Sequence, residues 1–113
     1  MEFKTISEFK KKLELGVKLH GINHTHFNGR DKDGVIIFKD LDLGIREVSI
    51  KQTNSFALKT TKKDGTVTDS WCGYPKASEC VIKDNTLVIY QEDFRSNMSG
   101  KIKILTYKPI INE

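Results

Sequence analysis

The chain has 113 residues, of which 37% are hydrophobic and 30% are charged. That length supports one hydrophobic core and no second one, so we expect a single domain over residues 1–113. Nineteen Lys and Arg against fifteen Asp and Glu give a net charge of +4, which permits attraction to polyanions and disfavours an acidic mimic of DNA. No apolar run approaches the roughly 20 residues of a membrane-spanning helix, so the sequence gives a membrane role no support.

The N-terminal segment is charged and amphipathic, and it lacks the apolar stretch of roughly 7 to 15 residues that marks a secretory signal. We therefore expect the protein to be cytoplasmic. Thr5-Ile6-Ser7-Glu8 fits a capping box, in which the Thr hydroxyl and the Glu carboxylate accept bonds from backbone N–H groups at a helix start. Phe9 and Leu13 share one helical face. Gly16 suits a left-handed stop, which predicts a helix over about residues 6–15.

The rest of the chain, over about residues 17–108, has the period-two alternation of β-strands. Val35–Phe38 and Glu47–Lys51 predict two separate strands. Asp64-Gly65 suits the positive φ angles of a tight turn and predicts a hairpin, with Asp84-Asn85 as a second turn.

The strand pattern predicts an α+β fold whose sheet is mainly antiparallel. About six or seven short strands follow one N-terminal helix, and the repeated helical crossovers of a parallel sheet are missing. We expect a curled sheet or a small barrel, with the helix covering an open end or face.

The three histidines and two cysteines fall in two distant segments of the chain. His20, His24 and His26 lie early, and Cys72 and Cys80 lie late. Neutral imidazole and thiolate are ligands that tetrahedral zinc prefers, so two contributions from each segment would close a four-ligand site. Such a site would be structural, because a catalytic zinc site keeps an open position for water or substrate.

The same five residues have a reading without metal. Independent buried thiols and surface histidines explain the spacing equally well, and a Cys72–Cys80 disulfide is disfavoured in a reducing cytoplasm. In a straight strand His20 and His24 lie roughly 13 Å apart, so a bend would be needed to bring both to one ion. His24 and His26 face one side and are geometrically easier.

Catalytic motifs are missing from the sequence. It has no Gly-rich phosphate loop, no Gly-x-Ser-x-Gly elbow and no His-Glu-x-x-His helix, so we do not expect an enzyme. Asp31, Asp33, Asp40 and Asp42 lack the ligand spacing of a calcium loop, and we assign them to turns and solvated edges.

Four aromatic residues are candidates for a binding surface. Trp71, Tyr74, Phe94 and Tyr107 could stack on single-stranded nucleic acid, which the positive charge would assist. Trp71 shares its strand parity with Val67, so we expect it in the core. Tyr74 and Phe94 are the attractive exposed anchors, for nucleic acid or for a protein.

Three strings of the sequence carry a resemblance: Thr5–Lys11 (TISEFKK), Asn54–Leu58 (NSFAL) and Ser70–Cys80 (SWCGYPKASEC). The chain resembles small uncharacterised phage and mobile-element proteins of Gram-positive bacteria, over nearly its whole length. Within that group His20, His24, Cys72 and Cys80 match the pattern and His26 does not, so the resemblance implies these four as the zinc ligands.

A small protein of this kind is also similar to anti-CRISPR proteins that act on type II RNA-guided nucleases. The resemblance implies a stoichiometric inhibitor in the host bacterial cell, with the CRISPR effector nuclease as its partner, which blocks target-DNA loading without cleaving anything. The alternatives are a small nucleic-acid-binding or regulatory phage protein and a minor virion component. The sequence specifies no contact surface or oligomeric state.

Overall fold

A computed structural model describes residues 1–95 and 98–110 of the chain. Its elements are α1 (Ile6–Lys12), β1 (Lys18–Arg30), β2 (Ile36–Lys51), β3 (Ser55–Thr61), β4 (Val67–Gly73), the 3-10 turn η1 (Ala77–Glu79), β5 (Cys80–Lys83), β6 (Thr86–Glu92) and β7 (Lys101–Pro109). The strands form one sheet in the order β4-β3-β2-β1-β7-β6-β5, and each neighbouring pair is antiparallel. The predicted α+β class with a curled antiparallel sheet is confirmed, and the sheet stays open between its edge strands β4 and β5.

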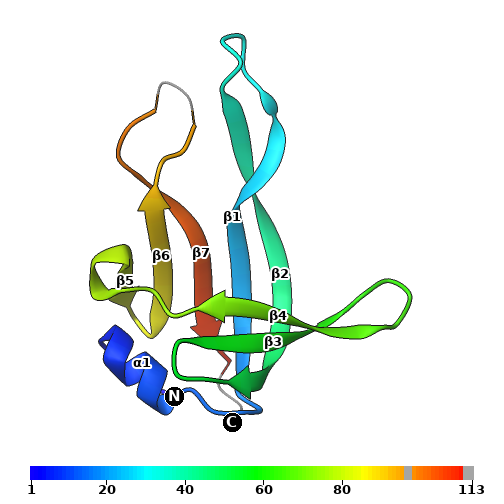
Figure 1. The fold of residues 1–113 in the computed structure, drawn as a ribbon, viewed down its shortest axis with the longest axis vertical. Helices are drawn as coiled ribbons and strands as arrows, with labels where there is room; N and C mark the ends of the chain where they lie inside the picture. The colour runs from blue at the N-terminus through cyan, green and yellow to red at the C-terminus, as the bar shows by residue number, and fades with distance from the viewer. Residues whose placement is uncertain (96–97, 111–113) are drawn as a thin grey trace.

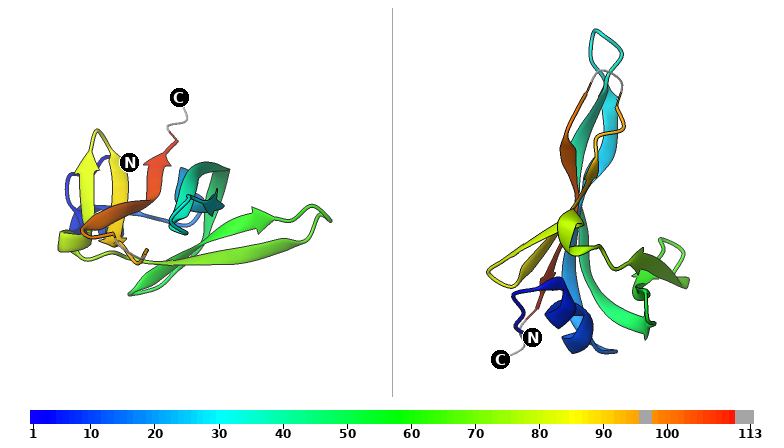
Figure 2. Two further views of the ribbon diagram at one scale, coloured as in Figure 1. Left: turned by 90° about the horizontal axis from the view of Figure 1, so that it is seen from above. Right: turned by 60° about the vertical axis from the view of Figure 1, so that its left-hand side comes forward.

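The molecule has a packed end and two projecting hairpins (Figure 1). At the packed end, which we call the base, α1 lies below β5 and β6 and next to one end of β3. The β1–β2 hairpin extends away from the base, and Phe94, after the end of β6, contacts Phe38 of this hairpin. Figure 2 shows that the β3–β4 hairpin stands off to one side. Within the described residues, no helix is long and apolar enough to cross a membrane.

The helix begins as the sequence predicts and ends earlier. The Thr5 Oγ1 accepts a hydrogen bond from the Glu8 N–H at 3.1 Å, which caps the first turn. The predicted end near residue 15 is wrong, because Leu13 leaves the helical conformation with ψ 128 and its side chain is fully buried in the core. Gly16, with φ +89, then turns the chain and donates its N–H to the Val48 carbonyl at 3.0 Å.

The segment that the sequence divides into two strands is one 16-residue strand, β2. Its pairing with β1 shifts register at several points, which are β-bulges or irregularities that bend the strand without ending it. At one of them Gly44 has φ +73, and the Asp42 Oδ1 accepts the Gly44 N–H at 2.7 Å. The Asp and Gly residues that favour a turn in the sequence are used here inside a continuous strand.

Aromatic rings hold the base together. The Phe9 ring packs edge-on against Phe3 at 5.0 Å and Phe56 at 6.1 Å between centroids, so α1 is fixed to β3. Phe56 in turn contacts Tyr107 of β7 at 5.9 Å, which joins the β3–β4 layer to the other half of the sheet. The core cluster consists of Phe3, Phe9, Leu13, Leu19, Val48, Phe56, Leu58, Leu87, Ile89 and Tyr107.

Both predicted tight turns are present. The Lys62 N–H donates to the Thr66 carbonyl at 2.8 Å and closes the β3–β4 turn, in which Gly65 has φ +87. Asp84 and Asn85, with φ 52 and 57, form the two-residue turn between β5 and β6.

Candidate functional site

The two histidines proposed as zinc ligands lie on the outer face of the sheet. Leu19 of β1 is buried in the core, so its neighbour His20 faces outward by the alternation of the strand. The His20 Nε2 lies 2.7 Å from the Asp42 Oδ1. His24 lies between two partners, with its Nδ1 2.8 Å from the Asp40 Oδ1 and its Nε2 2.6 Å from the Thr106 Oγ1.

The two cysteines lie on the inner side, where both pack against the core cluster. Cys72 of β4 is the register partner of Phe56, and burial raises the pKa of its thiol. The Cys80 Sγ lies 3.4 Å from the Lys76 carbonyl, and burial followed by the nearby Glu79 carboxylate raises the pKa of this thiol also. Both cysteines are free, in surroundings that favour the protonated thiol over the thiolate that zinc binds.

The four predicted ligands are therefore not brought to one place. Strands β1 and β7 separate the outward-facing histidines from the cysteines, which pack on the core side. In the described part of the chain, no three His, Cys, Asp or Glu side chains are arranged to hold a metal ion. Zinc binding by His20, His24, Cys72 and Cys80 stays a prediction, which metal analysis of the untagged protein would test.

Thr106, His24 and Asp40 form a hydroxyl–imidazole–carboxylate chain, the order in which a catalytic triad is arranged. A triad also needs free backbone donors for the oxyanion. Thr106 lies in β7, which pairs with β1 on one side and β6 on the other, so the surrounding backbone N–H groups belong to the sheet. We assign the chain of bonds to orienting His24 on the outer face.

The roles of Asp40 and Asp42 were missed in the sequence, which placed them at turns and solvated edges. The sequence does contain one indication: histidines recur on the first strand of the hairpin and aspartates recur on the second. The register shifts between β1 and β2 conceal which side chains meet, so pairing could not be read by counting from the turn. Asp31 does act as a turn residue, because its Oδ1 accepts the N–H groups of Asp33 and Val35.

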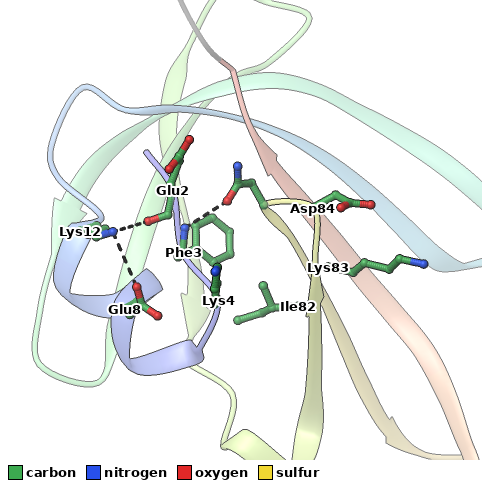
Figure 3. Close-up of a pocket in the computed structure, with 9 residues that line it drawn as sticks. Glu2, Phe3, Lys4, Glu8, Lys12, Ile82, Lys83 and Asp84 are labelled. Atoms are coloured by element: carbon green, nitrogen blue, oxygen red, sulfur yellow. Dashed lines mark hydrogen bonds and ion pairs between the residues drawn. The ribbon is translucent and has the colours of Figure 1, made fainter.

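A hollow of about 710 Å³ lies between the N-terminal segment, α1 and the β5–β6 turn (Figure 3). The Phe3 N–H donates to the Asn85 Oδ1 at 3.1 Å, and Lys12 binds the Glu2 carbonyl and the Glu8 carboxylate. The charged side chains that line it are Lys4, Lys12 and Lys83 against Glu2, Glu8 and Asp84. These charges cancel, so the hollow has no electrostatic preference for an anion or a cation.

The far end of the β1–β2 hairpin carries a cluster that we call the aromatic tip: Phe27, Phe38, Phe94 and Arg95. Phe27 and Phe38 are register partners, so they share one face. Phe94 of the β6–β7 loop packs on Phe38 at 5.8 Å between centroids, and the Arg95 guanidinium lies 5.0 Å from the Phe38 ring. Phe27 and Phe94 are 57% and 60% exposed, which confirms the predicted exposure of Phe94.

Trp71 is 52% exposed, so its expected place in the core is wrong. Its neighbour Cys72 pairs with the buried Phe56 and faces inward, which leaves Trp71 on the outer face opposite Ala57. Tyr107 is in the core. Tyr74 is half-buried and packs on Phe9 at 6.4 Å, and its hydroxyl is buried without a hydrogen-bond partner among the described residues.

Neither a protein-family description nor any curated protein or solved structure matches the sequence. The class of protein is therefore defined by its own architecture, which in the described residues is a curled antiparallel sheet with one helix and two projecting hairpins that carry exposed aromatic side chains.

Proposed function

We propose that this chain is a binding protein that inhibits a host defence nuclease, in particular a type II RNA-guided nuclease, by occupying its surface and preventing target-DNA loading. The observation that carries the proposal is the aromatic tip. Exposed aromatic side chains with an adjacent arginine are the residue types that dominate binding energy at protein interfaces. The tip lies away from the base, so a partner can cover it without disturbing the core.

The tip is ordered by contacts that do not need a partner. Arg95 makes two hydrogen bonds to the Asp93 carboxylate, at 2.7 and 3.0 Å, and a third to the Ile36 carbonyl at 3.4 Å. These bonds fix the loop residue Phe94 against the hairpin residue Phe38. A surface that is ordered before binding loses less conformational entropy when the complex forms, which favours tight stoichiometric association.

The choice of target is supported by the resemblance to phage and anti-CRISPR proteins. A stoichiometric inhibitor needs a stable scaffold and a contact surface, and it needs no catalytic group. The cytoplasm of the host bacterial cell is the compartment in which such a nuclease works. The partner in this proposal is the host CRISPR effector nuclease itself.

The test is a cleavage assay with purified nuclease, guide RNA and target DNA, in which the chain is added before or after the DNA. Inhibition should be complete near one equivalent when the chain is added first, and weak when DNA is already loaded. Phe94→Ala and Phe27→Ala should each weaken inhibition about 30-fold, the effect of an interface hot spot of about 2 kcal/mol. Val81→Ala, which removes a side chain of matched exposure (55%) from β5, should have no effect.

Undiminished cleavage at a large excess of the chain would reject this target. Full inhibition by both Phe variants would move the contact surface away from the aromatic tip. Equal inhibition before and after DNA loading would reject the blocking of DNA loading as the mechanism.

Direct nucleic-acid binding is the second candidate, because Trp71 lies exposed near basic side chains. Lys59 is on the same face of the β3–β4 hairpin, and Lys62 and Lys63 are exposed at its turn. An aromatic ring beside lysines can stack on a base while the lysines contact phosphates. Gel shifts with single- and double-stranded DNA and RNA should then weaken steeply with salt, and no shift at low salt eliminates this function.

A further inference from the structure

Strand β4 is an edge of the sheet, and in the part of the chain that the structure describes a defined set of its backbone groups has no backbone partner. The Lys62 N–H binds the Thr66 carbonyl and the Tyr74 N–H binds the Asn54 carbonyl, so these two pairs bracket the β3–β4 ladder. In an antiparallel ladder only every second residue bonds to the neighbouring strand. Counting every second residue from either of these two pairs leads to the same result, which is that Thr68, Ser70 and Cys72 bond to β3. The N–H and C=O groups of Val67, Asp69, Trp71 and Gly73 point away from the sheet.

This edge lacks three of the features that usually prevent another strand from pairing, namely proline, lysine and a β-bulge. Residues 67–73 contain no Pro and no Lys, and their seven register pairs with β3 run without a bulge. The other edge, β5, is four residues long. There the N-terminal segment is bonded to the β5–β6 turn through Phe3 and Asn85. Among the described residues, no backbone hydrogen bond outside the β3–β4 ladder involves residues 67–73 of the longer edge.

The side chains at the free backbone groups also have a pattern. Val67 and Trp71 are 58% and 52% exposed, and the exposed Asp69 lies between them on the same face. The Asp69 Oδ1 accepts the Ser49 hydroxyl at 2.6 Å, so a residue on the free side would bind the Oδ2 of this carboxylate. Within the sheet, β3 places Thr61, Lys59 and Ala57 opposite these three residues. A strand that paired on the free side would lie directly opposite Val67, Asp69 and Trp71, and its side chains would contact these apolar, acidic and apolar residues in turn.

We propose that the free edge of β4 binds an extended segment of a partner protein, which adds as an eighth, antiparallel strand. The segment carries a lysine or arginine opposite Asp69, and β-branched or aromatic residues opposite Val67 and Trp71. This inference rests on the proposed function, because it assumes that the partner of the chain is a protein. It assigns a second contact surface, separate from the aromatic tip.

Charge selects this occupant over the two others that could cover the edge. A second copy of β4 supplies no cation to Asp69, since residues 67–73 have none, and pairing centred on Asp69 would oppose two carboxylates. A nucleic acid would bring phosphates towards that carboxylate. A basic, alternating strand is the segment that satisfies both the backbone groups and the side chains.

The test uses a synthetic peptide, Thr-Thr-Val-Thr-Lys-Thr-Val, whose residues would pair with positions 73 to 67 of β4. Trp71 is the one tryptophan of the chain, so its fluorescence reports on this edge alone. Bound peptide should shield Trp71 from acrylamide quenching. In the free protein the amides of Val67, Asp69 and Trp71 should exchange with solvent faster than those of Thr68 and Ser70, and the peptide should slow them at least tenfold.

Two control peptides separate backbone pairing from general stickiness. N-methylation at the peptide's first Val and its Lys removes donors that would bond to β4, and Glu in place of Lys opposes Asp69. Each change should weaken binding at least tenfold. Asp69→Asn should remove the preference for Lys over Glu, and Val81→Lys on the other edge should leave binding unchanged.

Equal binding of the N-methylated peptide would overturn the proposal, as would unchanged Trp71 quenching at millimolar peptide. Shielding of Trp71 that rises with protein concentration alone, with a dimer mass in light scattering, would assign the edge to a second copy instead. Shielding by single-stranded DNA and not by peptide would assign it to nucleic acid. The peptide assay contains no nuclease, so its failure and the failure of the proposed function are separate results.

Discussion

The base and the projecting hairpins use the same strands in opposite ways. Leu19, near the start of β1, is fully buried, whereas Phe27, eight residues further along the same strand, is 57% exposed. On β3 and β4 the contrast is between the two faces, since Phe56 is fully buried and Trp71 is 52% exposed. The sheet thus extends well beyond the core that it encloses.

The difference teaches where stability and recognition are located. The ten residues of the core cluster come from the N-terminal segment, from α1 and its C-cap, and from five of the strands, β1, β2, β3, β6 and β7, and they lie at the base. The exposed aromatic side chains on the hairpins bury less of their surface than the core rings do, so each contributes less to the free energy of folding. Substitutions in the two regions should separate stability from binding.

The largest expected effect is at the base, for Phe9→Ala. The Phe9 side chain is fully buried and contacts the rings of Phe3, Phe56 and Tyr74, so its removal leaves a cavity where α1 meets the sheet. We expect a loss of about 3–5 kcal/mol in the free energy of unfolding, measured by urea denaturation. Phe27→Ala at the tip is the matched control, with an expected change within about 0.5 kcal/mol. Similar losses of stability in both variants would contradict the separation of a stabilising base from a binding tip.

The next effect is expected for Gly21→Ala in the middle of β1. A methyl group there would lie 3.0 Å from the Tyr107 ring, which is held in the core and cannot move freely. Overpacking of this kind costs about 1–3 kcal/mol. Gly73→Ala at the end of β4 is the control, because its nearest atom would be the Asn54 carbonyl at 3.9 Å, and thermal unfolding should show almost no change. Equal stability of the two variants would show that the ring yields.

A smaller effect is expected for the bond that ties the N-terminal segment to the β5–β6 turn. Asn85→Gly keeps the positive φ of this position and removes the side chain that accepts the Phe3 N–H. The expected loss is about 0.5–1.5 kcal/mol in the free energy of unfolding. Asn85→Asp retains the acceptor and should lose less. If both variants lose the same amount, the bond is not the cause.

The elements that follow from local chemistry were predictable. The Thr5 cap, the Asp64-Gly65 hairpin and the Asp84-Asn85 turn each depend on residues within a few positions, and all three are present. The expectations about strands that fail depend on register. The bulges of β2 and the parity of Trp71 are set by pairing between strands, which the sequence does not display.

The candidate site was predictable only in part, for the same reason. Phe94 was identified because an aromatic residue in a polar loop has no strand to bury it. Phe94 and Arg95 are neighbours in the sequence, but both contact Phe38, which lies more than fifty residues earlier. No local pattern predicts that contact. The opposite placement of His20 and Cys72 likewise follows from which face of each strand meets the core.

The smallest expected effect is a pH-dependent loosening of the aromatic tip. Hydrogen bonds from Arg95 lower the pKa of Asp93 below the ordinary value of 3.8, so the folded tip favours the carboxylate. A lowered folded pKa stabilises the tip above the ordinary value, and the contribution is lost as pH falls through the folded pKa. In a titration from pH 6 to 2, the side-chain Nε signal of Arg95 should therefore move only below about pH 4. Global unfolding is the wrong readout, because the pKa values of Asp42 and Asp64 are lowered as well. Asp93→Asn should give the low-pH position of the Arg95 signal at every pH, and a signal that still titrates in this variant would place the charge that holds Arg95 elsewhere.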